Sequence, residues 1–329
     1  MKVLVTGGAG FIGSHVVDRL ATAGYSPKVL DLAPPPTDNG HVEWIVGDLL
    51  DRDALARAMR GCDAVIHLAA VADVSVVAGD PARADLVNVR GTQFALEAAR
   101  LAGVRRFVYA STVWVYAGAS ANGRPLDEDT PLVLPSHFYT ATKLAGEMYC
   151  RSYGELFGLE QTILRFGIPY GPRSRPAAVV ASFVFRARAG EPLLIAGDGL
   201  QTRQFVYVRD LADGIVAALQ ESSPAGVYNL VGTESTSVRA IADYVRELVA
   251  DVPIVHVEPR RADVETRHAS AARAARHLRW RAETPFRDGV RSYVDWLAET
   301  QTNGSPRAAT ASRIDGSAKT VLRQDPSEL

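Results

Sequence analysis

The chain has 329 residues, of which 47% are hydrophobic and 22% charged, so it is long enough for one large globular domain or two modest ones. A formal net charge of -1 gives no electrostatic basis for binding nucleic acid, and no apolar stretch reaches the roughly 18–20 residues of a membrane span, so we expect neither partner. Cys62 and Cys150 stand far apart without metal-ligand spacing, which favours reduced thiols in a cytoplasmic protein and no bound metal.

The first half of the chain alternates short apolar runs with helical patterns. The runs are rich in Val, Ile and Leu and continuous, which is typical of strands covered on both faces. These predicted strands lie at residues 2–6, 28–32, 42–46, 64–69, 106–110 and 162–166. The predicted helices lie at residues 13–23, 51–60, 81–102 and 139–157. This order predicts right-handed βαβ crossovers and an α/β fold with a doubly wound parallel sheet of the Rossmann type.

Beyond residue 172 the alternation is less regular. Helices are predicted at residues 177–189, 210–220, 238–249 and 287–298, and strands at residues 193–196, 204–208, 227–231 and 254–258. We therefore expect a cofactor-binding domain over residues 1–172 and a smaller α/β lobe over residues 173–299. That lobe would mainly bind substrate, with some of its elements returning to the sheet. Residues 300–329 are rich in Ser, Thr, Ala and charge, a composition typical of a disordered tail.

The first predicted strand runs into a glycine-rich turn that contains Gly7, Gly10 and Gly13. Glycine there lets backbone amides approach a pyrophosphate, and the N-terminus of the following helix adds partial positive charge. Asp31 ends the second predicted strand, where a carboxylate accepts both ribose hydroxyls of an adenosine and repels a 2′-phosphate. The turn therefore predicts NAD rather than NADP as the cofactor.

Two further polar residues have two interpretations each. Asp48 follows the third predicted strand, where it either hydrogen-bonds an adenine amino group or caps the helix at residues 51–60. His67 lies on an apolar strand, and we interpret it as a packed histidine rather than a catalyst.

Three residues predict the chemistry. Tyr139 and Lys143 are four residues apart on a predicted helix and therefore share one face. A phenol with a pKa near 10 is mostly protonated at neutral pH, and both a neighbouring ammonium and an oxidised nicotinamide favour its ionised form. Thr112 follows the fifth predicted strand, at the edge of the sheet where ligands bind, and its hydroxyl could orient a substrate hydroxyl. Together the three predict a proton-transfer unit beside a hydride acceptor.

Motifs spread from Met1 to about Ala298 carry a family resemblance. They are TGGAGFIGSH, GDL, HLAA, NVRGT, STVWVY, YTATK, LRFGIPYGP, GDGLQTRQFVYVRDLADG and EPRRADV. Together they resemble the extended short-chain dehydrogenase/reductases, and within them the NAD-dependent nucleotide-sugar epimerases and dehydratases.

The resemblance implies a set of site residues. Cofactor binding falls to Gly7, Gly10, Phe11, Ile12, Gly13, Asp31, Asp48, Leu49, Leu68, Ala69, Ala70, Asn88, Tyr139 and Lys143. Thr112, Tyr139 and Lys143 become the catalytic set, with Thr112 also contacting substrate. Arg203 and Arg260 fall where relatives bind the nucleotide diphosphate, a role suited to a planar guanidinium.

The sequence departs from the family pattern at two places. Ile168 stands where relatives usually carry a substrate-contacting Asn. Val113 and Trp114 stand where 4,6-dehydratases carry the Asp-Glu pair that performs the elimination, and neither side chain can transfer a proton. We expect the acidic run at residues 127–129 to face solvent rather than to replace that pair.

The resemblance implies epimerisation of a nucleotide-linked sugar, at C4 and through a transient 4-keto intermediate. One alternative is an NAD-dependent reductase or dehydrogenase of a 4-keto sugar or secondary alcohol, which uses the same three residues but exchanges its cofactor. Another is a non-catalytic NAD-binding sensor, which has no need of all three residues together.

Relatives dimerise through the helices that correspond to residues 81–102 and 139–157, so we expect a homodimer. The apolar side chains available for this pairing are Leu86, Val89, Phe94, Leu101, Met148, Tyr149 and Tyr153.

Overall fold

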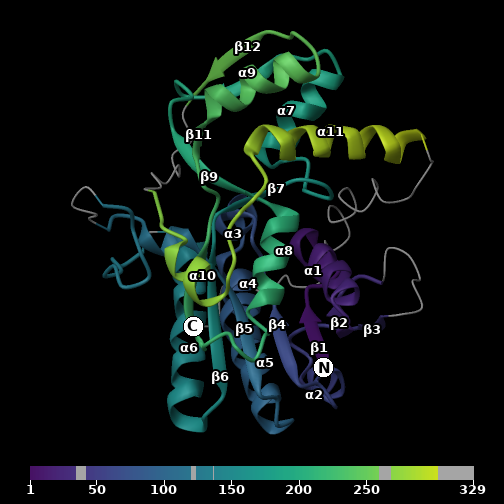
Figure 1. Ribbon diagram of the computed structural model, residues 1–329, viewed down its shortest axis with the longest axis vertical. Coiled ribbons are helices and arrows are strands. Elements are labelled where there is room, and N and C mark those ends of the chain that lie inside the picture. Colours follow the sequence, from purple (N-terminus) through teal and green to yellow (C-terminus); the bar gives the residue numbers. More distant parts are fainter. Residues whose placement is uncertain (35–41, 120–123, 136, 259–267, 303–329) are drawn as a thin grey trace, which may run out of the picture.

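A seven-stranded sheet forms the centre of the computed structural model, which describes residues 1–34, 42–119, 124–135, 137–258 and 268–302 (Figure 1). The strand order is β10-β6-β5-β4-β1-β2-β3, and every neighbouring pair is parallel. The strands are β1 (Lys2–Thr6), β2 (Ser26–Asp31), β3 (Glu43–Val46), β4 (Ala64–His67), β5 (Arg106–Thr112), β6 (Glu160–Phe166) and β10 (Gly226–Leu230). The predicted doubly wound parallel sheet is confirmed.

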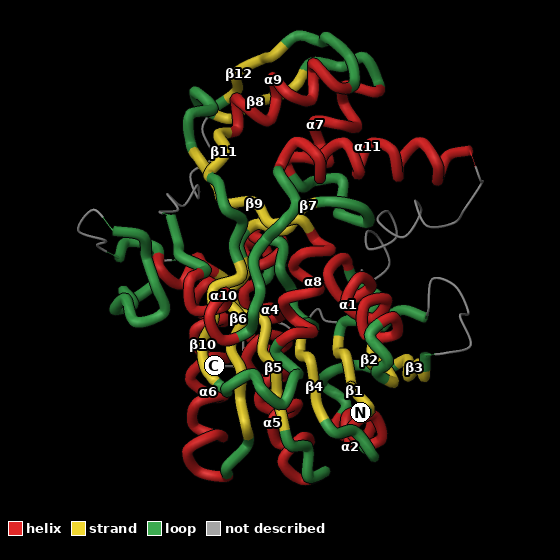
Figure 2. Tube along the Cα trace, in the orientation of Figure 1, coloured by secondary structure: helices red, strands yellow, loops and turns green. Residues whose placement is uncertain are grey.

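Both faces of the sheet are covered by helices (Figure 2). Along β1, Val3 and Val5 belong to one apolar core and Leu4 to the other, as the two-residue period of a strand requires. The first core also includes residues of α1 (Phe11–Thr22), α8 (Val208–Ala217) and α10 (Ala272–His277). The second includes residues of α2 (Arg52–Met59), α5 (Gly91–Leu101) and α6 (Phe138–Phe157).

A smaller lobe lies beyond the carboxyl ends of the central strands, at the top of Figure 1. It contains two small sheets, of order β11-β9-β7 and β12-β8. Its elements are β7 (Ile168–Tyr170), α7 (Val179–Arg188), β8 (Leu193–Ala196), β9 (Thr202–Tyr207), β11 (Ser235–Ser237), α9 (Val238–Leu248), β12 (Ile254–Val257) and α11 (Phe286–Thr302). Tyr170 and Phe205 pack against Phe286 in its core, with ring centroids 4.9 and 5.2 Å from that of Phe286.

The chain passes between the lobe and the central sheet more than once. Strand β9 in the lobe continues directly into α8, which covers the central sheet. The chain then forms β10, which pairs with β6 at the edge of that sheet, before it returns to β11.

The largest local difference from the predicted elements concerns residues 81–102. They form α4 (Pro81–Asp85), one π-helical turn η1 (Leu86–Arg90) and then α5. The preceding short helix α3 (Val74–Gly79) was not predicted, and neither were β7, β11, α10 or the 3₁₀ turn η2 (Val113–Tyr116). All of these span six residues or fewer, too few for a periodic pattern to stand out.

The last helix continues past its predicted end, because α11 runs to Thr302. Residues 303–329 of the predicted tail lie outside the described residues. None of the helices that the structure describes combines the length and the apolar character needed to cross a membrane.

Candidate active site

The glycine turn after β1 is tight enough to require its glycines. Gly7 has a φ of +74°, and a Cβ built on it would lie 2.8 Å from the backbone N of Ala69. A Cβ on Gly13 would lie 2.1 Å from the carbonyl oxygen of Gly7. Helix α1 begins directly after Gly10, and no side chain of the described residues caps it. Its first amides therefore suit the pyrophosphate of a dinucleotide.

The carboxylate of Asp31 lies beside this turn. It accepts hydrogen bonds from the backbone N of Ala9 at 2.9 Å and of Ala33 at 3.0 Å. Asp48 is exposed and accepts from the backbone N of Leu50 at 2.9 Å. The residue that caps α2 is Asp51, so the capping interpretation of Asp48 is wrong.

The segment after β4 borders the same turn. Leu68, Ala69 and Ala70 are half-buried there. The side chain of Asn88 is buried in η1; it accepts from the backbone N of Val71 at 2.7 Å and donates to the carbonyl of Val71 at 3.0 Å. It also donates to Thr142 Oγ1 at 3.1 Å, which connects this segment to α6. Asn88 thus fixes the backbone at Val71, in the segment that borders the glycine turn.

His67 is a packed histidine. Its Nδ1 lies 2.8 Å from Thr6 Oγ1 and its Nε2 lies 3.1 Å from Thr92 Oγ1. Burial lowers its pKa to about 3, so the ring is neutral at physiological pH.

The three predicted catalytic residues come from α6 and from the end of β5. Lys143 is buried, and its Nζ lies 5.9 Å from the ring centroid of Tyr139 and donates to the carbonyl of Ala110 at 2.9 Å. Thr112 is the last residue of β5, and its Oγ1 accepts from the backbone N of Trp114 at 3.2 Å. The Thr112 hydroxyl keeps its proton to donate to a ligand.

Burial acts on both ionisable groups of this set. It raises the pKa of Tyr139 to about 12, and the positive charge of Arg175 partly opposes that rise. It lowers the pKa of Lys143 to about 8. Each shift disfavours the charged form, as desolvation requires.

Two aromatic residues that the sequence did not suggest as site residues border Tyr139. The Trp114 ring lies edge-on to those of Tyr139 and His137, with centroids 6.1 and 5.7 Å away. Among the described residues, neither Trp114 Nε1 nor His137 Nδ1 has a hydrogen-bond partner, although both atoms are buried. The sequence did contain one indication that Trp114 lies near Tyr139, because Trp114 is only two residues after Thr112.

The predicted substrate residues have different outcomes. Arg203 lies on β9 and donates to the carbonyl of Thr202 at 2.8 Å. Arg260 lies outside the described residues. Ile168 begins β7 and packs against the core of the smaller lobe. Arg175 was not predicted; it follows β7 and pairs with Asp73 at 2.5 Å.

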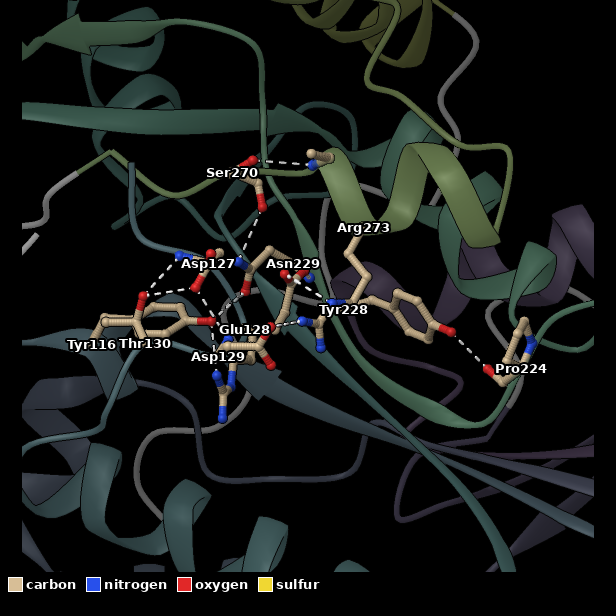
Figure 3. A network of polar contacts seen from close by, with 12 residues as sticks. Tyr116, Asp127, Glu128, Asp129, Thr130, Pro224, Tyr228, Asn229, Ser270 and Arg273 are labelled. Carbon is tan, nitrogen blue, oxygen red and sulfur yellow. Dashed lines mark hydrogen bonds and ion pairs between the residues drawn. The ribbon is translucent and has the colours of Figure 1, made fainter. Parts of the chain in front are cut away.

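The expectation for the acidic run at residues 127–129 is wrong for Glu128, which is buried (Figure 3). Glu128 Oε1 accepts from the backbone N of Asn229 at 2.7 Å, and its Oε2 lies 3.5 Å from Arg273. Strand β10 is an edge strand, so this amide points away from the sheet and needs another acceptor. Burial raises the pKa of Glu128. Asp129 is exposed and also pairs with Arg273.

No group of three or more His, Cys, Asp or Glu side chains in the described ranges could hold a metal ion. The fold and the glycine turn instead place the chain in a class of enzyme, the dinucleotide-binding α/β enzymes. Its turn, acidic strand end and helix N-terminus fit the cofactor of that class.

The chain belongs to the NAD dependent epimerase/dehydratase family, whose sequence model matches residues 3–231. The UDP-glucose 4-epimerase of Mycolicibacterium smegmatis is 35% identical over 315 residues, which cover 90% of this chain and 98% of that protein. Two solved UDP-glucose 4-epimerases are also similar. The Thermotoga maritima enzyme with UDP-glucose has a TM-score of 0.86 at 32% identity, covering 92% of this chain and 100% of that one. The Thermus thermophilus enzyme with NAD has a TM-score of 0.83 at 37% identity, covering 91% and 99%. The family resemblance and the NAD cofactor are thereby confirmed.

Proposed function

We propose that this chain is an NAD-dependent epimerase that inverts C4 of a nucleotide-linked sugar through a transient 4-keto intermediate. One observation carries the proposal. Tyr139 and Lys143 share a face of α6, and Lys143 donates to the carbonyl of Ala110 on β5, two residues before Thr112, in a chain that UDP-glucose 4-epimerases match over nearly its whole length. A UDP-linked hexose is therefore the first substrate to test.

In this mechanism Tyr139 is the general base and then the general acid. Its phenolate oxygen takes the proton of the 4-hydroxyl, and Thr112 donates a hydrogen bond that orients the sugar oxygen. Bound NAD would supply the hydride acceptor for C4 and the hydride donor of the return step. The keto sugar turns to present its other face before Tyr139 gives the proton back. No net oxidation or reduction of the cofactor would result, so it would not need to leave between turnovers.

The charge of Lys143 serves this proton transfer. Burial raises the pKa of Tyr139 to about 12, which alone would leave too little phenolate at neutral pH. Because the pKa of Lys143 is about 8, most Lys143 side chains carry the protonated ammonium at pH 7. This positive charge, together with that of the oxidised nicotinamide, favours the phenolate.

Four groups of residues would hold the cofactor. The amides of Phe11, Ile12 and Gly13 at the start of α1 suit the pyrophosphate, and Gly7 and Gly10 allow its close approach. Asp31 would accept the adenosine ribose hydroxyls. Asp48 and Leu49 would contact the adenine, and the segment at residues 68–70 would border the nicotinamide side of the turn.

Arg203 supports the substrate assignment from the smaller lobe. A guanidinium on β9 suits the diphosphate of a nucleotide sugar, and Arg260 is proposed for the same role on the sequence pattern alone. The buried thiols Cys62 and Cys150 support a reducing, cytoplasmic location.

The residues after Thr112 favour epimerisation over elimination. Val113 and Trp114 supply neither the acid nor the base that removal of water across C5 and C6 needs. Incubation with dTDP-glucose or UDP-glucose should therefore give no 4-keto-6-deoxy sugar, which is read from the absorbance of that product in alkali. Formation of this product would assign the elimination to another carboxylate.

The test of the function combines two measurements. Native mass spectrometry should find NAD retained through purification, and a panel of nucleotide sugars should show interconversion of C4 epimers without net change in NAD or NADH. Stoichiometric consumption of added NADH would make the protein a reductase. Tight NAD binding without turnover of any sugar would make it a sensor.

A further inference from the structure

A buried ion pair lies directly behind the proposed catalytic residues. Glu147 follows Lys143 by one turn of α6 and Tyr139 by two, so the three share a face. Glu147 Oε1 accepts from Arg165 Nε at 2.9 Å, and Oε2 accepts from Arg165 Nη2 at 2.7 Å. Each side chain is only 1% exposed. The pair is thus bidentate and almost fully removed from water.

Stability alone gives no reason for such a pair. Taking two charges out of water costs about as much as their attraction returns, and apolar side chains of similar volume often stabilise a core as well or better. What the pair provides is direction, because a bidentate guanidinium–carboxylate contact fixes both the distance and the plane of its partners.

The Glu147 side of the pair holds α6 against β5, the strand that carries Thr112. Glu147 Oε1 also accepts from Ser111 Oγ at 2.5 Å, and Ser111 directly precedes Thr112. Two neighbouring contacts join the same elements: Tyr109 Oη donates to the carbonyl of Lys143 at 3.3 Å, and Lys143 Nζ donates to that of Ala110. Three successive residues of β5 therefore fix the height and rotation of α6.

The Arg165 side of the pair holds η2, the turn that follows Thr112. Arg165 Nη1 donates to Tyr116 Oη at 2.8 Å, and the guanidinium lies 4.9 Å from the centre of that ring. Tyr116 Oη donates in turn to Asn229 Oδ1 at 2.9 Å (Figure 3). Tyr116 ends η2, which starts directly after Thr112. Arg165 therefore reaches residues on both sides of Thr112, Tyr116 directly and Ser111 through Glu147.

We propose that Glu147 and Arg165 are positioning residues for the proton transfer: their ion pair sets Tyr139 and Lys143 on α6 against the hydroxyl of Thr112 on β5. The inference rests on the proposed function. Proton transfer between a phenol and a sugar hydroxyl needs hydrogen-bond distance, and a displacement of about 1 Å can cost about 100-fold in rate.

Arg165→Lys is the principal test, because it keeps the charge but loses the two-pronged contact and the bond to Tyr116. The same two strands offer a matched control at their other ends. There Arg106 is buried, lies opposite Glu160 in register and pairs with it at 3.0 Å. We expect Arg165→Lys to lower kcat by about 10- to 100-fold per NAD-bearing site, with KM little changed. Arg106→Lys should leave kcat within about twofold of the unmodified enzyme.

Ser111→Ala is a milder variant for the case that Arg165→Lys does not fold. It removes one of three donors to Glu147 and leaves the ion pair in place, and we expect about a tenfold loss of kcat. The low-pH limb of the kcat profile should also move to higher pH in both variants, because Lys143 is held less firmly beside Tyr139. Unchanged kcat and an unchanged profile in folded Arg165→Lys and Ser111→Ala proteins would overturn the proposal, even if their unfolding midpoints fell.

A substrate-free measurement separates this proposal from the proposed function. The tyrosinate absorbance of Tyr139 in the NAD-bound protein is obtained by subtracting the spectrum of Tyr139→Phe. Its titration midpoint should rise in Arg165→Lys and stay constant in Arg106→Lys. If the unmodified protein epimerises no nucleotide sugar but this midpoint shifts, the function is wrong and the positioning role stands. If epimerisation occurs and the midpoint does not shift, the function stands and the positioning role is wrong.

Discussion

The hydroxyl of Tyr109 occupies the space that a Cβ on Gly146 would need, since the two atoms would lie 2.0 Å apart. Tyr109 is buried on β5, and Gly146 lies on α6 between Lys143 and Glu147. The helix that carries the proposed base therefore rests directly on an aromatic side chain of the strand that ends in Thr112.

Gly146→Ala should displace α6 from β5. We expect it to lower the free energy of unfolding by about 1–3 kcal/mol and to reduce kcat, because the new methyl group overpacks a filled core. Gly154→Ala on the same helix is the control. Its Cβ would come within 3.3 Å of the flexible Gln161 side chain, and alanine favours a helix over glycine by about 1 kcal/mol. Urea unfolding and kcat check both variants, and equal stabilities would contradict the expectation.

Tyr139→Phe should keep the fold and NAD binding but lose turnover by about 10²–10⁴-fold, the usual contribution of a general base. Tyr153→Phe is a matched change on α6, because the Tyr153 hydroxyl contacts Glu97 rather than the site. It should leave kcat near that of the unmodified enzyme. Thr112→Val should be milder than Tyr139→Phe, since it removes an orienting hydroxyl and not the base. Retention of more than about a tenth of the rate by Tyr139→Phe would rule out the mechanism.

Lys143 should make stability depend on pH. Its folded-state pKa of about 8 lies below its ordinary value of 10.5, so the unfolded chain binds this proton more strongly. The free energy of unfolding therefore gains from this group as pH rises from about 8 to about 10.5, by about 3 kcal/mol at most. Lys143→Met lacks this gain. Urea unfolding of NAD-stripped protein at pH 7 and pH 10 should show the unmodified chain gaining relative to Lys143→Met, and parallel changes would refute the shift.

Asp31→Asn should weaken the preference for NAD over NADP by about tenfold or more, about 1.4 kcal/mol. The amide oxygen can still accept from one of the backbone amides of Ala9 and Ala33, while the charge that repels a 2′-phosphate is gone. Asp63→Asn is the control, because that carboxylate accepts from the backbone N of Lys2 at the amino ends of the strands, away from the glycine turn. Titration with both cofactors measures the ratio. Equal NAD and NADP affinities in the unmodified protein would end the assignment.

A homodimer through α5 and α6 is the last expectation. Leu101 on α5 is 70% exposed and Met148 on α6 is 52% exposed, which leaves apolar surface on both helices. Light scattering at micromolar concentration should give a dimer, and Met148→Glu should shift it toward monomer. Leu200→Glu, at a 69% exposed leucine of the smaller lobe, should have no such effect. A monomeric unmodified protein would refute this interface.

Sequence patterns predicted the parts of the site that depend on local order. The glycine turn and the four-residue spacing of Tyr139 and Lys143 follow from the chain itself, and the sheet follows from runs of apolar residues. Glu147 carries no such signal, and Arg165, although it lies in the predicted strand at residues 162–166, has no identifiable partner until α6 is placed on β6.

Burial that depends on segments far apart in the chain could not be predicted from the local sequence. Glu128 lies in a polar loop by composition, yet it is buried because the loop covers the edge of β10, about a hundred residues further along the chain. The π-helical turn at η1 was equally hidden, since one extra residue in a turn leaves the hydrophobic period of residues 81–102 almost unchanged.

The repeated passage of the chain between lobe and sheet limits how such an enzyme can be rebuilt. A transplant of residues 173–299 from a relative would exchange β10 together with the lobe, and with it Asn229, which accepts the hydrogen bond of Tyr116. The recipient would lose part of the frame around Thr112 along with its old sugar preference. We expect modular exchange to fail in this architecture, and new substrate ranges to arise through substitutions at individual positions such as Ile168 and Trp114.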